Sequence, residues 1–259
     1  MRMMKKVLGT VTVLALSVSL LAGCGSTAAS PVSSAASTAA ESTTSSIVSE
    51  TTSAAADENV AAAAQLLNDL TGSYQELWPV ILADEYKQTW LDDCTALVGE
   101  ENAEAAFEKL SSMVTSDVYG EDAVEAYANG GGAYFCGFTN SLATLTFDGE
   151  TSTISGTDKD GDVLFSHTYH YIGMEPVHGL YEFESDDADS GEFTYFFLAP
   201  DTSAETYHIE FRYGSDAEAL SQYDAGEYAY WVASGISTDC DQTMIDNCIE
   251  LFCTENLAG

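Results

Sequence analysis

The sequence predicts an α+β fold, in which an antiparallel β-barrel has N-terminal and C-terminal helices packed against it. From Ala133 to Tyr213 the aromatic and β-branched residues recur with a period of two, and turn signals separate the runs. On either side of this region the apolar residues recur at the spacing of amphipathic helices. Several short strands in chain order favour a meander that closes into a barrel.

The segment before Gly130 is predicted to be helical. Asp57 is placed to cap a helix that contains the apolar residues between Ala61 and Leu70. Apolar residues at helical spacing around and after Pro79 predict a second, long helix: Leu77, Ile81, Trp90, Cys94 and Leu97. Residues 105–114 predict a third helix, and Gly130-Gly131-Gly132 ends the helical region.

The strands are expected in short runs with period-two patterning: Tyr134–Phe138, Leu142–Phe147, Thr151–Ser155, Val163–Tyr171, Leu180–Glu184, Glu192–Leu198 and Thr206–Tyr213. Asp148-Gly149 and Asp160-Gly161 lie between runs and are typical of hairpin turns. Two helices are expected afterwards, over Asp216–Tyr223 and Asp239–Phe252. Asp239 and Gln242 could form a capping box.

The N-terminus has the pattern of a secretory signal. Met1 to Lys6 is basic, and Val7 to Leu21 is mainly apolar but too short to span a bilayer comfortably. Leu21-Ala22-Gly23-Cys24 resembles a bacterial lipobox, with an ordinary signal peptide and a chance cysteine as the alternative. We therefore expect residues 1–23 to be removed. The chain would then be held at the extracytoplasmic face of the cell membrane by a lipid on Cys24.

Two further regions follow the leader. Residues 24–56 carry the lipidated cysteine and then consist mostly of Ser, Thr and Ala without apolar periodicity, so we expect a disordered tether. No Pro- or Gly-rich break divides the remainder, so residues 57–259 are predicted to form one domain.

The charge balance excludes two classes of function. The chain has 7 Lys plus Arg against 42 Asp plus Glu, a net charge of −35. Three basic residues lie in the leader, so its removal leaves four against 42 and a charge of −38. A sequence-independent nucleic-acid binder is excluded, because such binding needs Lys and Arg. Charge-driven docking on an anionic membrane is disfavoured for the same reason, so the lipid is the only expected membrane contact.

The cysteines leave their pairing open. Five follow Cys24 in the mature chain: Cys94, Cys136, Cys240, Cys248 and Cys253. An odd number outside the cytoplasm leaves at least one thiol unpaired. Buried apolar thiols, or a bridge between Cys94 and the C-terminal helix, are both compatible with the sequence.

The sequence contains no motif of an enzyme, and we do not expect the protein to be one. The sequence has no G-x-S-x-G, Walker loop or H-E-x-x-H. Asp158–Asp162 resembles the start of a calcium loop, but the closing Glu is absent at the required spacing, which favours a hairpin turn. His208 shares a strand face with Thr206 and Glu210. This arrangement is compatible with a binding site or with a histidine satisfied inside the barrel.

The domain resembles the ZinT (YodA) family of lipocalin-like, or calycin, zinc-binding domains. The resemblance rests on short stretches that keep the family's order: 70–79 (LTGSYQELWP), 169–173 (YHYIG), 183–184 (FE), 199–200 (AP), 207–211 (YHIEF), 214–216 (GSD) and 228–231 (YAYW). It implies a lipocalin-like barrel that binds zinc.

The family's zinc-binding histidines are matched only in part. Of the three, His208 matches one, while Thr206 and Phe196 occupy the other two positions. The resemblance therefore implies a degenerate or remodelled site. We consider Glu210, His170 and His178 as replacement ligands. His167 lies on the other face of the strand that carries His170, and alternation is expected to point His208 into the barrel mouth.

Two functions remain in view. The first is a cell-surface lipoprotein that binds a divalent cation, zinc, in metal acquisition or homeostasis. A metal-uptake transporter or its solute-binding protein would be its partner. The second is a metal-free calycin module that binds a small apolar ligand or a protein partner. Neither function involves nucleic acid.

The leader generates a direct prediction. Replacing the lipidated residue (Cys24→Ser) should abolish labelling by a fatty-acid analogue and release the protein into the soluble extracytoplasmic fraction, because no other membrane anchor is expected after cleavage. Metabolic labelling and cell fractionation measure both effects. Unchanged membrane retention of the variant would contradict the assignment.

Overall fold

A computed structural model of the chain describes residues 58–130, 132–199 and 208–258. The predicted signal peptide, Cys24 and the tether lie outside the described residues, as do Asp57 and Thr206. All strands and helices named below belong to the described ranges.

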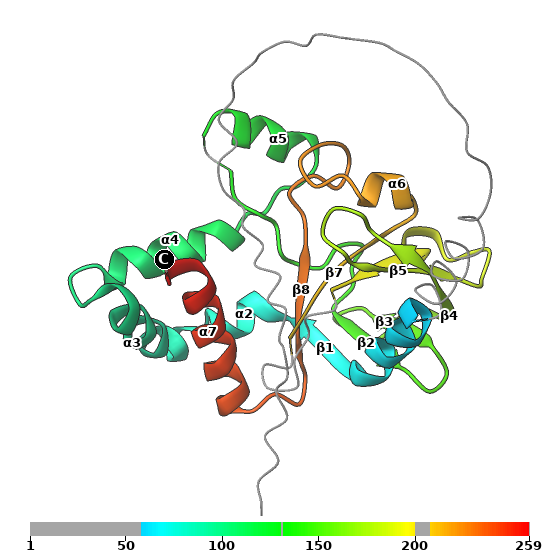
Figure 1. The fold of residues 1–259 in the computed structure, drawn as a ribbon, viewed down its shortest axis with the longest axis horizontal. Helices are drawn as coiled ribbons and strands as arrows, with labels where there is room; N and C mark the ends of the chain where they lie inside the picture. Colours follow the sequence, from blue (N-terminus) through cyan, green and yellow to red (C-terminus); the bar gives the residue numbers. More distant parts are fainter. Residues whose placement is uncertain (1–57, 131, 200–207, 259) are drawn as a thin grey trace, which may run out of the picture. The chain divides into compact units, whose positions relative to one another are not determined.

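An eight-stranded antiparallel β-barrel forms the centre of the described part of the chain (Figure 1). The strands follow one another around the barrel in chain order: β1 Gly72–Glu76, β2 Thr144–Asp148, β3 Thr153–Thr157, β4 Val163–Met174, β5 Tyr181–Ser185, β6 Tyr195–Leu198, β7 His208–Gly214 and β8 Ala233–Ser237. Strand β1 pairs with both β2 and β8, which closes the sheet. The predicted α+β class and the antiparallel barrel are therefore confirmed.

The hairpin turns follow the sequence signals. Between β3 and β4 the Asp158 carboxylate accepts hydrogen bonds from the backbone N–H groups of Asp160 and Asp162, each at 2.9 Å, and Gly161 has a φ of +85°. The segment that resembles a calcium loop is therefore a β-turn. At the β2–β3 turn, a side chain on Gly149 would meet the backbone of Asn68 at 2.4 Å, so glycine permits the close approach of the preceding helix.

The predicted set of strands needs three corrections: one predicted strand does not form, and two strands were missed. The run 134–138 forms isolated bridges rather than a strand, because Phe135 pairs singly with Thr115 and Trp231. Strands β1 and β8 were not predicted, although they close the barrel. Their sequences, GSYQE and ASGIS, are poor in the aromatic and β-branched residues that identify the other strands.

One helix precedes β1, most of the others lie in the long connection between β1 and β2, two short ones lie in later connections, and α7 follows β8. They are an unlabelled helix over residues 58–69, α2 Leu77–Ile81, η1 Asp84–Tyr86, α3 Lys87–Val98, α4 Ala103–Val114, α5 Glu121–Ala128, η2 Gly191–Phe193, α6 Ala217–Leu220 and α7 Gln242–Leu257. The amphipathic helix predicted after Pro79 is confirmed as α3. It does not include Leu77 and Ile81, because Ala83 is extended (φ −59°, ψ 145°) and separates α2 from η1 and α3. Asp241, rather than Asp239, caps α7 by accepting from Met244 N at 3.0 Å.

The buried apolar residues form two cores. One core fills the barrel. The helix over 58–69 packs against it through Ala63, Leu66 and Leu67, and Leu70, which follows the helix, is buried there as well. The other lies outside the barrel, where α2, α3, α4 and α7 pack together and against Ile236 of β8. The barrel is thus covered by a helical layer on the side of β7 and β8.

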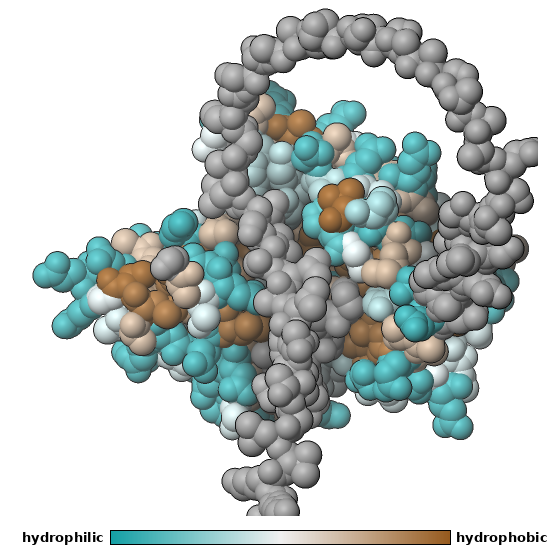
Figure 2. Space-filling model, in the orientation of Figure 1, coloured by the Kyte–Doolittle hydropathy of each residue, from teal (hydrophilic) through white to brown (hydrophobic). Residues whose placement is uncertain are grey.

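The surface is mostly hydrophilic, as expected from the acidic composition. On the face seen in Figure 2, hydrophilic residues predominate and hydrophobic residues form separate patches. Within the described ranges, no helix combines the length and the apolar character needed to cross a membrane.

The α3–α7 interface generates a pH prediction. One carboxylate oxygen of Asp93 is buried without a hydrogen bond. Burial first, then the charges of Glu250, Asp246 and Asp92, raise the pKa of the Asp93 carboxyl. The folded state therefore holds this proton more tightly than the unfolded state does. The stability that the protonated Asp93 carboxyl adds to the folded state is fully present below the pKa of the unfolded state. It is lost as the pH rises through the pKa of the folded state.

Replacing this carboxyl (Asp93→Asn) should accordingly raise the Tm at pH 7 by roughly 2 °C, and the gain should shrink towards pH 4. The matched control is Asp92→Asn, because Asp92 is exposed and accepts a hydrogen bond from Gln88. Thermal unfolding followed by circular dichroism across this pH range measures both variants. Equal shifts in the two would show that the effect is only one of net charge.

Candidate functional site

Strand β7 turns its polar residues towards the helical layer rather than into the barrel. Phe211 and Tyr213 are fully buried in the barrel core. Alternation along the strand places His208 and Glu210 on the opposite, outer face. His208 also pairs in register with Ile236, which belongs to the core of the helical layer. The expectation that His208 points into the barrel mouth is therefore wrong.

A small cavity separates this outer face from helix α7. Its volume is about 30 Å³. It has polar lining residues from both elements, His208 and Glu210 from β7 and Cys248 and Glu255 from α7. The rest of the lining is apolar: Leu77, Trp78, Ile81, Leu251 and Phe252. We call this space the β7–α7 cavity.

Helical periodicity brings the α7 residues to one side. Cys248, Leu251, Phe252 and Glu255 are spaced three, four and seven residues apart, so they share a helix face. Phe252 fixes that face against α2 and α3, since its ring is 4.7 Å from that of Trp78 and 6.0 Å from that of Trp90. The position of α7 over β7 is therefore set by aromatic packing.

The donor set of the β7–α7 cavity matches the preferences of zinc. Imidazole nitrogen, carboxylate oxygen and thiolate sulfur are all zinc ligands. The volume of about 30 Å³ is enough for one ion or one water molecule, and too small for an organic ligand.

The ligands are not assembled in advance. Among residues 58–130, 132–199 and 208–258, no three His, Cys, Asp or Glu side chains are gathered so that they could hold a metal ion. Burial, with a smaller contribution from Cys240, raises the pKa of the Cys248 thiol to about 12. The thiol is therefore protonated at neutral pH, and coordination by its sulfur would release a proton.

The other predicted ligands lie on different elements. His170, on the outer face of β4, has its Nδ1 2.8 Å from a carboxylate oxygen of Asp186 and its Nε2 3.9 Å from one of Glu184. His178 follows β4, with its Nδ1 3.6 Å from Glu175 and its ring 3.8 Å from that of Tyr223. Neither residue lines the β7–α7 cavity. The structure thus brings together only His208 and Glu210 of the predicted set.

His167 and His170 diverge, as expected from strand alternation. His167 has its Nδ1 2.8 Å from Asp187 and stacks on Phe165, on the inner face of β4. His170 faces outwards to Asp186. The two imidazoles belong to separate His–Asp pairs.

Phe196 cannot share a site with His208. It pairs in register with Tyr213 on the inner face of the barrel, and it is fully buried among aromatic rings: Phe165, Tyr169, Phe211 and Tyr213. A histidine at position 196 would therefore be buried in this core instead of adding a ligand beside His208.

Sequence reasoning missed two residues of the β7–α7 cavity. Cys248 was considered only as a buried thiol or a disulfide partner, and Glu255 lies beyond the predicted end of the last helix at Phe252. Their spacing of seven on one helix was the available signal, because it places them on the same face. The spacing alone does not show which strand is covered by this face of α7.

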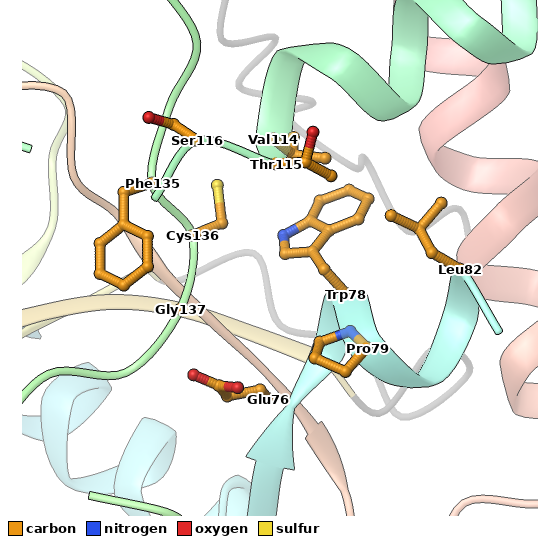
Figure 3. A pocket seen from close by; sticks show the side chains of 10 residues that line it. All are labelled: Glu76, Trp78, Pro79, Leu82, Val114, Thr115, Ser116, Phe135, Cys136 and Gly137. Carbon is orange, nitrogen blue, oxygen red and sulfur yellow. The ribbon is translucent and has the colours of Figure 1, made fainter. Parts of the chain in front are cut away.

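A larger pocket, of about 330 Å³, is also lined by Trp78 (Figure 3). Its lining includes Glu76, Leu82, Val114, Phe135 and Cys136. The Trp78 indole nitrogen points towards the Cys136 thiol, which opposes the rise in the pKa of that thiol, and it has no stronger acceptor although the residue is only 7% exposed. Because Trp78 also lines the β7–α7 cavity, its ring is a wall common to both spaces.

Polar chemistry in this Trp78 pocket is sparse. The Glu76 carboxylate accepts a hydrogen bond from Phe138 N at 2.6 Å. Burial, followed by the charge of Glu210, raises the pKa of the Cys136 thiol, so it is not a thiolate nucleophile at neutral pH. The pocket therefore offers an apolar wall and one N–H donor whose neighbour is the Cys136 sulfur, a weak acceptor.

Comparison with known proteins gives structural matches only. No family model and no curated protein matches the sequence. The structure is similar to the Zn(II)-bound ZinT-like domain of Streptococcus pneumoniae AdcA, with a TM-score of 0.45 and 15% identity over 71% of this chain and 89% of that domain. It is also similar to Zn(II)-bound AdcA from the same organism, with a TM-score of 0.43 and 14% identity over 72% of this chain. The match covers 35% of AdcA.

Proposed function

We propose that this protein binds one divalent cation, with zinc as the preferred ion, in the β7–α7 cavity. One observation carries the proposal. An imidazole, two carboxylates and a thiol from two elements line a cavity whose volume, about 30 Å³, suits a single ion. The cation is cargo in this proposal, and no catalytic step is assigned to it.

The affinity is expected to be moderate. A complete structural zinc site contributes roughly 10–16 kcal/mol. Here the ligands are not gathered beforehand, so side chains of α7 must shift towards His208 and Glu210, and the Cys248 proton must be displaced. Both requirements reduce the binding free energy. Moderate affinity would suit a protein that passes its ion to another carrier.

The electrostatics and the proposed location support capture outside the cytoplasm. A net charge of −38 on the mature chain would raise the local concentration of cations. A lipid on Cys24 would hold the domain on the cell membrane, where a metal-uptake transporter or its solute-binding protein would take over the ion. Lipidation, location and partner are parts of the proposal.

Removing the imidazole of the cavity (His208→Ala) should weaken zinc binding at least tenfold, which is about 1.4 kcal/mol. The matched control is His170→Ala, because His170 pairs with Asp186 outside the cavity. Calorimetric titration with zinc against a competing chelator measures both variants on the mature chain carrying Cys24→Ser. Repeating the titration in buffers of different ionisation enthalpy counts the protons released on coordination.

An equal loss of zinc affinity in the two variants would contradict the proposed position. So would a tight zinc site that His208→Ala leaves unchanged. In the second case, the His–Asp pairs of β4 would be the next region to test.

The Trp78 pocket favours a second function, the binding of a small neutral molecule. Its volume of about 330 Å³ lies in the range of small-molecule sites. The carbonyl oxygen of an apolar ligand would give the buried indole N–H a stronger acceptor than the Cys136 sulfur. The barrel interior is a poorer candidate, because the rings of Phe196, Phe211 and Tyr213 pack against one another there.

Nile red provides a suitable probe, since it is neutral, carries a carbonyl oxygen and brightens in apolar surroundings. Removing the donor while keeping an aromatic ring (Trp78→Phe) should weaken its binding by roughly five- to tenfold. Val163→Ser is the matched control, because Val163 is an exposed apolar residue, 71% accessible, outside the pocket. Dye binding that depends on Val163 rather than Trp78 would reflect the general surface.

A further inference from the structure

Two cysteines that are far apart in the sequence have their sulfur atoms in contact. Cys94 lies in α3 and Cys253 in α7, and their Sγ atoms are 3.9 Å apart. Both side chains are fully buried in the core of the helical layer. The two helices pack side by side (Figure 1).

The separation is short enough for a covalent bond after small movements. A disulfide bond has a length of about 2.05 Å, so each sulfur would have to move by roughly 1 Å. The bond requires rotation of the two side chains about their Cα–Cβ bonds. The other three described cysteines have different surroundings: Cys136 lies beside Trp78, Cys248 lines the β7–α7 cavity, and Cys240 is partly exposed before α7.

We propose that Cys94 and Cys253 form a disulfide bond in the exported protein, which joins α3 to α7. The proposal uses from the proposed function only the export of the chain to a compartment that permits disulfides. It does not depend on zinc binding.

The chemistry is thiol–disulfide exchange. The thiolate of one cysteine attacks a donor disulfide, such as that of an oxidoreductase or oxidised glutathione, and one donor sulfur leaves. The thiolate of the second cysteine then attacks the mixed disulfide and displaces the other donor sulfur. The protein loses two electrons and two protons, and the donor leaves as two thiols.

The timing follows from burial. Both sulfurs are inaccessible once the helical layer is packed. A donor disulfide must therefore reach them before α7 docks on α3, or during local opening of α7. We expect rapid formation during refolding and slow formation in the folded, reduced protein.

The bond would tie the end of the chain to a helix that precedes most of the barrel. Strands β2 to β8 all lie between Cys94 and Cys253 in the sequence. Closing so long a loop restricts the unfolded chain strongly, and a rise in Tm of roughly 5 to 15 °C is expected. The bond would also hold in place the helix that carries Cys248 and Glu255.

Peptide mapping tests the bond directly. The mature chain carrying Cys24→Ser is refolded from urea with oxidised and reduced glutathione, alkylated with N-ethylmaleimide and cleaved after glutamate. Cleavage isolates each cysteine of the pair on its own peptide, residues 86–100 and residues 251–255. Cys136 falls on residues 126–150, and Cys240 and Cys248 on residues 228–250.

Mass spectrometry should find peptide 86–100 joined to peptide 251–255, and a reductant should separate them. Recovery of both peptides in alkylated form, or of either joined to another peptide, would overturn the proposal. The same map on protein extracted from cell membranes tests the bond in the exported protein. Alkylated peptides from that source would overturn the claim for the cell.

Variants give an independent readout. Cys94→Ala and Cys253→Ala should each abolish the difference in Tm between oxidised and reduced protein, whereas Cys136→Ser should retain it. Zinc titration of the reduced wild-type chain tests the cation site separately, so either proposal can fail without the other.

Discussion

The burial of strand β7 on both faces is the constraint on which the rest of the arrangement depends. Its inner residues fill the barrel. On its outer face Arg212 is fully buried, while His208 and Glu210 are partly buried and line the cavity beside α7. In an ordinary antiparallel barrel the outer face of a strand meets water and can be polar without consequence. Here the polar residues His208 and Glu210 are instead held between a strand and a helix. The cation site that we propose therefore lies at the junction with the helical layer, not at the barrel mouth.

Arg212 shows how completely this outer face is covered. It is fully buried although it is the only Arg after the leader of a strongly acidic chain. Its guanidinium donates to the backbone carbonyls of Leu220, Gln222 and Tyr228 and lies 4.2 Å from the ring of Tyr223. Carbonyl dipoles, rather than a carboxylate, thus hold the segment between α6 and β8 over the strand. Trp78 lines both the β7–α7 cavity and the Trp78 pocket.

The sequence was informative where local patterns decide the structure. Alternating runs located β2 to β7, and Asp–Gly pairs located the hairpins, because strand and turn preferences are local properties. The closing strands β1 and β8 were missed, since GSYQE and ASGIS owe their conformation to their neighbours rather than to their own preference. The face of His208 was also missed. Alternation shows which residues share a face, but not which face is inside when both are buried. The convergence of α7 on β7 depends on the tertiary packing of Phe252 with Trp78 and Trp90, which no local pattern records.

Anomalous diffraction at the zinc edge, from crystals of the mature chain with one equivalent of zinc, tests the central claim most directly. The strongest peak should lie between β7 and α7, with the His208 imidazole nitrogen about 2.0–2.1 Å from the metal and at least one side chain of α7 completing the coordination. A strongest peak at the His167–Asp187 or His170–Asp186 pair, or inside the barrel, would contradict the claim that the covered face of β7 is the cation site.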